Sequence, residues 1–125
     1  MIVGVGLDVC EIARMKEMLA RPRFLARFFS ENERDYILSR GASGAQTAAG
    51  IYAAKEAFAK SLGTGISGME LKEIGVIHDE NGAPRYALSG GAQAAAAARG
   101  ARNIHLSITH DGGVAAAVAI AEGDA

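Results

Sequence analysis

The stretch YAAKEAFAKSLGTGISG, from Tyr52 to Gly68, carries an alanine-rich helix into a glycine-rich loop. Alanine is the strongest helix former, and the pattern predicts a helix from Ala45 to Leu62. Gly63 is expected to end it, because glycine readily adopts the left-handed conformation that commonly follows a helix. This is the longest element that the sequence predicts.

One side of this helix is apolar and another side is charged. At 100° per residue, Ile51, Phe58 and Leu62 fall together and form the predicted core side. Glu56 and Lys60 are four residues apart and lie next to each other on a different side. Such a pair is commonly an exposed ion pair that contributes little to stability, so its meaning depends on the other groups nearby.

The N-terminal segment from Ile2 to Val9 alternates in the way that predicts a β-strand. Gly4, Gly6 and Asp8 lie on one face of this strand. Because glycine weakens a strand and leaves space on its face, we expect another element to approach closely there. Asp8 alone can also be the cap of the helix that is expected to follow.

The other expected elements complete a single domain over residues 1–125. Helices are predicted at 11–20, 22–30, 30–40 (with Ser30 and Glu33 as a capping box) and 91–100. Strands are predicted at 70–78, 85–88, 103–109 and 114–122, with an Asn-Gly turn in the first hairpin. This order indicates an α+β fold with a mostly antiparallel sheet packed against helices. The small residues of the last strand indicate close packing against another element or another subunit.

Composition narrows the classes of function. A net charge of −1 argues against a general nucleic-acid binder. The single cysteine, Cys10, allows no disulfide within the chain and fits a reducing compartment. No stretch is long and apolar enough to span a bilayer, and no basic leader precedes the first apolar run. We therefore expect a cytoplasmic protein with no membrane partner.

Asp8 and Glu56 come from separate elements, and two such carboxylates are a reasonable site for a hard cation. Mg²⁺ typically takes one or two protein carboxylates and completes its shell with water and phosphate oxygens. Lys60, one turn from Glu56, would then neutralise a bound phosphate, and the backbone of GTGISG would approach an anion. The residues alone thus leave two alternatives, a surface ion pair or a site for a metal and a phosphate.

The histidines are less informative. His105 lies on the polar face of its predicted strand, where a structural role and a contact with phosphate or nucleotide are both open. His110 and Asp111 end that strand, and they either orient a base or form a turn. The three histidines do not have the spacing of zinc ligands.

Four stretches together resemble one known family. VGLDVCEIARM and YAAKEAFAKSLGTGI resemble the two signatures of the holo-acyl-carrier-protein synthases, the small single-domain 4′-phosphopantetheinyl transferases. NGAPRYALSG and HLSITHDGGVAAAVAI resemble later segments of that family in order and spacing. The resemblance covers essentially the whole chain. It implies the 4′-phosphopantetheinyl transferase fold and a homotrimer with sites between neighbouring subunits.

The resemblance implies transfer of the 4′-phosphopantetheine arm from coenzyme A to a serine of an apo acyl carrier protein, with release of adenosine 3′,5′-bisphosphate, in fatty acid and lipid biosynthesis. In the family an acidic pair binds Mg²⁺, and here that pair is Asp8 and Glu56. Lys60 matches the lysine that contacts the phosphate, so these three are the expected catalytic residues. The serine proton goes to Glu56 or to a metal-held water. The expected coenzyme contacts are Lys60, Ser61, Gly63, Gly65, Pro84 and His105.

The resemblance also gives a meaning to a basic segment. From Arg14 to Arg27 there are five basic residues and one acidic residue, Glu17. Carrier proteins are acidic around their serine, and the family meets them through the helix after the aspartate. The expected carrier contacts are Arg14, Met18, Arg21, Arg23 and Phe24. The alternative is a solvated helix face, with Met18 and Phe24 in the core.

One position departs from the family. Many relatives carry an arginine four residues before the signature lysine, where it helps to bind the 3′-phosphate of coenzyme A, but this chain has Ile51. Arg40, Lys55 or a residue of another subunit is then needed in its place. Two other functions also remain open, a non-catalytic module that binds coenzyme A or a carrier protein, and a purely structural trimeric domain.

Overall fold

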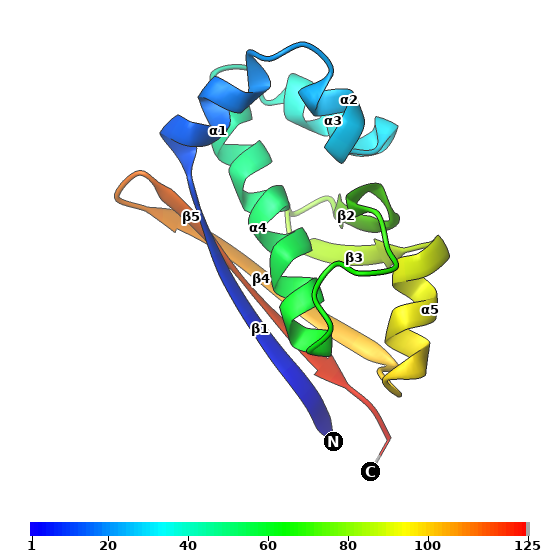
Figure 1. Cartoon of the computed structure of the whole chain (residues 1–125). Helices are drawn as coiled ribbons and strands as arrows, with labels where there is room; N and C mark the ends of the chain where they lie inside the picture. The colour runs from blue at the N-terminus through cyan, green and yellow to red at the C-terminus, as the bar shows by residue number, and fades with distance from the viewer. Residues whose placement is uncertain (125) are drawn as a thin grey trace.

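A computed structural model describes residues 1–124. The helices are α1 Ile12–Leu19, α2 Phe24–Phe28, α3 Glu31–Ser39, α4 Gly44–Leu62 and α5 Gly90–Ala98, with short 3₁₀ helices η1 Gly41–Ser43 and η2 Leu71–Glu73. The strands are β1 Ile2–Glu11, β2 Ile74–His78, β3 Pro84–Leu88, β4 Asn103–Asp111 and β5 Val114–Glu122. The predicted order of elements and the α+β class are confirmed (Figure 1).

All strand pairs are antiparallel, but they form two sheets where one was expected. β1, β5 and β4 lie side by side in that order, and β2 pairs only with β3. The β2–β3 hairpin contacts α4, where the Tyr86 hydroxyl donates a hydrogen bond to the Ala54 carbonyl of that helix. Within residues 1–124, no helix combines the length and the apolar character that crossing a membrane requires.

α4 lies across the inner face of the three-stranded sheet, and the predicted close approach to β1 is confirmed. A Cβ on Gly6 would lie 2.7 Å from the backbone nitrogen of Ser61, and one on Gly4 would also meet the helix backbone. The small residues of β5 face the same helix and are almost completely buried: Ala115, Ala117, Ala119 and Ala121. Their packing partner is therefore another element of the same chain.

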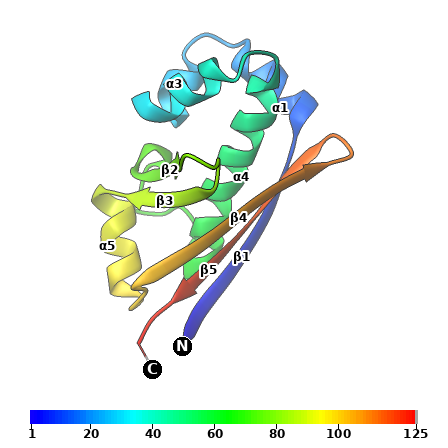
Figure 2. The same cartoon turned by 180° about the vertical axis from the view of Figure 1, so that it is seen from behind.

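Within the described residues, 1–124, no helix covers the outer face of this sheet. Figures 1 and 2 show the helices gathered on the inner side. Val5, Leu7 and Val9 of β1 are 58%, 62% and 56% exposed. They are paired across the sheet with Ile120, Val118 and Ala116 of β5, which lie on the same face. The result is a continuous apolar surface that the isolated chain leaves open to water.

Local capping explains three of the element boundaries among residues 1–124. Ser30 and Glu33 form the predicted capping box at the start of α3, and Gly63 ends α4 with a φ of 74°. The strand expected from Glu70 begins only at Ile74, because Glu70 and Glu73 cap each other around η2.

Candidate active site

Asp8, Glu56 and Lys60 line one hollow of about 370 Å³. Asp8 comes from β1, whose two glycines allow the strand to lie directly against α4. Glu56 and Lys60 come from consecutive turns of α4. Lys60 Nζ donates a hydrogen bond of 2.8 Å to Asp8 Oδ1, with the two side chains 54% and 20% exposed. The fold thus brings together the three residues that were expected to be catalytic.

The hollow carries an excess of negative charge. Burial raises the pKa of Glu56, the charge of Asp8 raises it further, and Lys60 opposes both. The hydrogen bond with Asp8 raises the pKa of Lys60, which therefore stays protonated. The lining carries three carboxylates, those of Asp8, Glu11 and Glu56, against two cationic groups, those of Arg14 and Lys60, so one negative charge remains for a further cation.

The donor set in this hollow fits Mg²⁺. Asp8 and Glu56 supply hard oxygen ligands from two separate elements, and their mutual repulsion is relieved when a cation lies between them. Among residues 1–124, no group of three or more His, Cys, Asp or Glu side chains is arranged to hold a metal ion. Two protein ligands are enough for Mg²⁺, which usually completes its shell with water and substrate phosphates.

Tyr52 is a residue of this site that sequence reasoning missed. It lines the acidic hollow, and together with Glu56 it also lines a neighbouring hollow of about 600 Å³. Burial and the charge of Glu56 raise the pKa of the Tyr52 phenol, which stays neutral. The signal was present in the sequence, because Tyr52 precedes Glu56 by four residues and therefore shares its side of the helix.

Lys55 does not belong to the site. Its side chain is fully buried, and Nζ lies 2.8 Å and 3.0 Å from the two carboxylate oxygens of Glu33. Burial lowers the pKa of Lys55, and the charge of Glu33 opposes that effect. The suggestion that Lys55 binds the 3′-phosphate is therefore wrong, because no part of its side chain reaches solvent.

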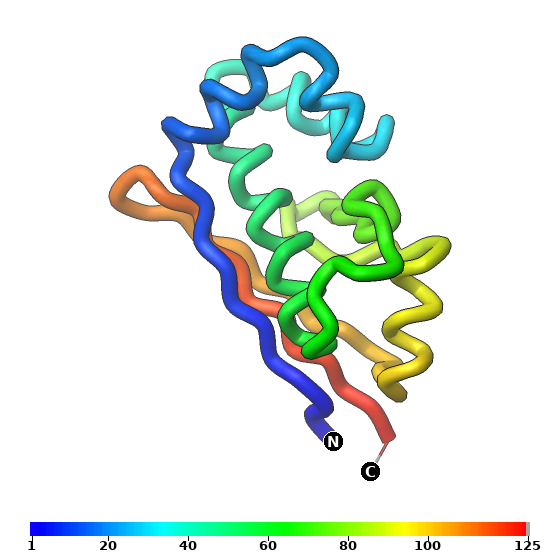
Figure 3. The backbone as a smooth tube through the Cα atoms, in the orientation of Figure 1, coloured from blue at the N-terminus to red at the C-terminus, as the bar shows by residue number. Residues whose placement is uncertain are grey.

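The loop after α4 presents the expected glycines but not the expected serine. Gly63 and Gly65 are exposed and have φ values of 74° and 68°, which side-chain-bearing residues rarely adopt. Figure 3 shows this green segment leaving the end of α4 and crossing toward α5. Ser61 is buried, and its hydroxyl donates to the Phe58 carbonyl at 2.7 Å. The structure therefore does not support a side-chain contact from Ser61 to a ligand.

Pro84 and His105 lie apart from the acidic hollow. Pro84 lines a hollow of about 190 Å³ together with Arg40 and His110. His105 is on β4, at the sheet edge opposite β1. It is exposed on the outer face and lies 2.9 Å from Glu122. Within one chain, the residues expected at the adenosine end of the coenzyme do not share a hollow with the residues expected at its phosphates.

Ile51 lies in the core as predicted, with 1% of its side chain exposed. It therefore cannot take part in binding a phosphate. Of the two replacements suggested within the chain, Lys55 is excluded by its burial, whereas Arg40 is exposed. Arg40 also lines the hollow that contains Pro84.

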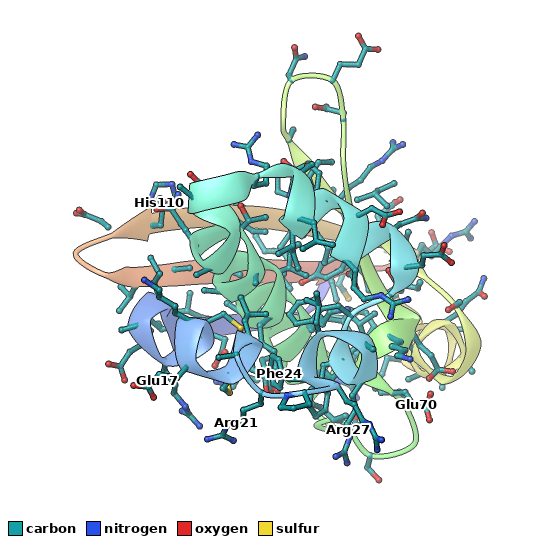
Figure 4. The ribbon with its side chains drawn as sticks, turned by 90° about the horizontal axis from the view of Figure 1, so that it is seen from above. Glu17, Arg21, Phe24, Arg27, Glu70 and His110 are labelled. Carbon is teal, nitrogen blue, oxygen red and sulfur yellow. The ribbon has the colours of Figure 1, made fainter. Side chains whose placement is uncertain are left out.

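The basic segment forms the surface beside the acidic hollow. Arg14 and Met18 of α1 line the acidic hollow itself. Arg21, Arg23 and Phe24 line a wider hollow of about 670 Å³ around α2. Figure 4 shows Arg21, Phe24 and Arg27 along one side of the molecule, opposite His110. Met18 and Phe24 are half-buried against the core, so each combines a packing role with an accessible surface.

Comparisons with known proteins agree with this arrangement. Residues 4–119 match the model of a family described as the 4′-phosphopantetheinyl transferase superfamily. The holo-[acyl-carrier-protein] synthase of Treponema denticola is 46% identical over 123 residues, which cover 98% of this chain and 100% of that protein.

Solved structures extend the likeness to the fold. The crystal structure of holo-[acyl-carrier-protein] synthase from Neisseria meningitidis superposes with a TM-score of 0.86 at 27% identity, covering 98% of this chain and 99% of that one. The Bacillus anthracis holo-(acyl-carrier-protein) synthase in complex with CoA (3′,5′-ADP) has a TM-score of 0.82 at 34% identity, covering 99% of both chains. The chain therefore belongs to the holo-[acyl-carrier-protein] synthase family of the 4′-phosphopantetheinyl transferase superfamily.

Proposed function

We propose that this chain transfers the 4′-phosphopantetheine arm of coenzyme A to a serine of an apo acyl carrier protein and releases adenosine 3′,5′-bisphosphate. The observation that carries the proposal is the hollow shared by Asp8, Glu56 and Lys60, in a chain 46% identical to a holo-[acyl-carrier-protein] synthase. Two similar structures, from Helicobacter pylori and Bacillus anthracis, are named as complexes with coenzyme A. These names support coenzyme A as the donor.

In the proposed reaction the serine oxygen forms a bond to the phosphorus that carries the pantetheine arm. The bond between this phosphorus and the bridging oxygen breaks, and adenosine 3′,5′-bisphosphate leaves with the electron pair. The serine proton passes to the Glu56 carboxylate, directly or through a water.

Asp8 and Glu56 are the residues that would hold Mg²⁺, for the reasons of charge and donor type given above. When bound, the ion supplies positive charge to the pyrophosphate and to the oxygen that leaves. Lys60 is exposed, and its long side chain can turn from Asp8 to a phosphate oxygen. Its role is to hold that phosphate and to balance the charge that develops on it.

The proposed active form is a homotrimer with each site shared between neighbouring chains. The uncovered apolar face around Val5, Leu7 and Val9 supports assembly, because soluble chains rarely leave such a continuous surface open. The exposed position of His105 on this same face supports a contribution from a second chain to the adenosine end. Arg40, in the hollow with Pro84, is the proposed replacement for the arginine that Ile51 displaces.

The carrier protein is proposed to dock on α1 and α2. Arg14, Arg21 and Arg23 are exposed there and would steer an acidic partner toward the hollow, whereas Met18 and Phe24 would supply apolar contact. Because exposed charges are screened by salt, this association should weaken as ionic strength rises.

The test is intact-mass spectrometry of an apo acyl carrier protein incubated with the chain, coenzyme A and Mg²⁺, with an EDTA control. We expect a gain of one phosphopantetheine group that requires the metal. Glu56→Gln should reduce the rate by about 10²-fold or more. Glu31→Gln, which changes an exposed glutamate on α3, is the matched control and should transfer normally.

The alternative is a module that binds coenzyme A or the carrier without chemistry. It predicts that a panel of carrier proteins remains unmodified, although coenzyme A or a carrier still binds in calorimetry. That combination would reject the transferase assignment.

A further inference from the structure

An ion pair is buried behind the site, and the chemistry proposed above does not use it. Lys55 Nζ contacts both carboxylate oxygens of Glu33, and the side chains are 0% and 1% exposed. Moving two charges out of water is costly, and the attraction between them seldom provides a large net gain in stability. A pair in this position therefore requires an explanation beyond the free energy of folding.

The pair also joins segments that are distant in sequence. The ammonium group donates to the carbonyl oxygens of Leu71 at 2.7 Å and Ile74 at 2.9 Å. The carboxylate accepts from the backbone N–H groups of Ser30 at 2.8 Å and Val76 at 2.8 Å. One point in the core thus holds α4, the start of α3, and the segment that leads through η2 into β2. Each of these hydrogen bonds is directional, which apolar packing is not.

Two of these segments, α4 and the segment that leads into η2, line the 600 Å³ hollow that contains Tyr52 and Glu56, and α2, which comes directly before α3, lines it as well. α4 provides those two residues, and Lys55 of the same helix is buried in the core. The end of α2 provides Phe28, two residues before Ser30. The segment 66–72 provides Leu71, whose carbonyl is bound by the pair.

We propose that Glu33 and Lys55 are positioning residues for the transfer reaction, because they hold the walls formed by α2 and by segment 66–72 in register with Glu56. The inference rests on the proposed function, in which α1 and α2 bind the carrier and the loop after Gly63 approaches the donor phosphates. Both substrates must then meet at Glu56. Neither side of the pair touches a substrate, since both side chains are buried.

The experiment compares stability, binding and turnover in the double variant Glu33→Gln/Lys55→Gln. Two neutral amides of similar size bury no unpaired charge and still offer hydrogen-bonding groups to the backbone. We expect the folded double variant to bind coenzyme A and the carrier separately, each within about threefold of wild type. Its kcat should fall at least tenfold, because a misplacement of about 1 Å can cost about 10²-fold in rate.

A control of matched stability separates positioning from folding. Ile104→Ala removes packing from β4, outside both hollows beside Glu56. If it lowers the melting temperature comparably, it should keep its kcat at a temperature where both variants are folded. A double variant with kcat within twofold of wild type, or with a loss no larger than that of the control, overturns the proposal. A double variant that loses binding of coenzyme A or the carrier but keeps the wild-type kcat also overturns the proposal.

Two further arms keep the test decisive. If the double variant does not fold, Glu33→Asp, which shortens the acid by one methylene and keeps its charge, is judged by the same criteria. Wild-type transfer is measured first. Failure of wild type to transfer rejects the proposed function, whereas normal wild-type transfer with a fully active double variant rejects only the positioning role.

Discussion

Gly6→Ala tests whether the contact between β1 and α4 places Asp8 for its function. The added Cβ would lie 2.7 Å from the Ser61 nitrogen and closer still to the Ala57 carbonyl oxygen. Both atoms belong to the helix backbone, so neither can rotate away. Moving from 2.7 Å to an ordinary contact of 3.4 Å takes about 0.7 Å, and the Ala57 contact requires more. We therefore expect strand and helix to separate by roughly 1 Å.

This separation should affect stability and activity to different extents. Overpacking of this kind costs about 1–3 kcal/mol, which lowers the melting temperature by roughly 4–11 °C in a chain of this size. Asp8 follows Gly6 by two residues and moves with the strand, away from Glu56. We expect transfer to slow by about 10²-fold at a temperature where the variant is folded. Calorimetry without coenzyme A, with Mn²⁺ as the probe of the proposed Mg²⁺ site, should show weaker binding of the cation.

Gly44→Ala is the matched control for this prediction. It makes the same chemical change at the start of α4, where φ is −58° and the new Cβ would lie 3.2 Å from the Ile37 carbonyl oxygen. This contact requires only a few tenths of an ångström, so stability and rate should stay close to wild type. If folded Gly6→Ala transfers within twofold of wild type, the reasoning is refuted, because the close β1–α4 contact would not then place Asp8.

Three further predictions concern the charges and the outer sheet face. Lys60→Gln should increase Mn²⁺ affinity a few-fold in calorimetry without coenzyme A, because Asp8 loses a competing partner, while it lowers the transfer rate; unchanged affinity would contradict this. Burial raises the pKa of Glu56 in the folded, metal-free protein above its ordinary value of 4.5. Protonation of Glu56 therefore stabilises the folded state relative to the unfolded state. As pH rises from below 4.5 through the raised pKa, wild type should therefore lose stability relative to Glu56→Gln in thermal unfolding; parallel curves would contradict this. Leu7→Asp changes a side chain that is 62% exposed and should give folded monomers in light scattering; an unchanged assembly would argue against the outer face as the interface.

The parts of the site that could be predicted depend on local sequence patterns. The helical wheel separated Ile51, which is buried, from Glu56 and Lys60, which line the hollow. Alternation in the first strand placed Asp8 on the same face as Gly4 and Gly6. Because glycine has no side chain, these two residues indicated that another element lies close to that face. These signals were reliable because periodicity and side-chain volume act within a few residues of one another.

Lys55 and Glu56 show what only the tertiary structure decided. The two residues are adjacent and both charged. The helical wheel places Lys55 on the side of Ile51 and Phe58, but nothing local supplies the partner that a buried charge requires. Lys55 is buried because Glu33, 22 positions earlier, and two carbonyl groups from the segment after α4 surround its ammonium group. Such partners come together only when the whole chain folds.

The same distinction applies to the sheets and to the molecule as a whole. The sequence by itself determined the elements and their order, and it made Asp8, Glu56 and Lys60 candidates for a site, because hydrophobic period, capping and glycine placement are local properties. The tertiary structure decided which face of β5 meets α4, which face stays open, and that the β2–β3 hairpin forms its own sheet. Those outcomes depend on side chains from distant segments competing for the same surface, and no short stretch of sequence contains that information.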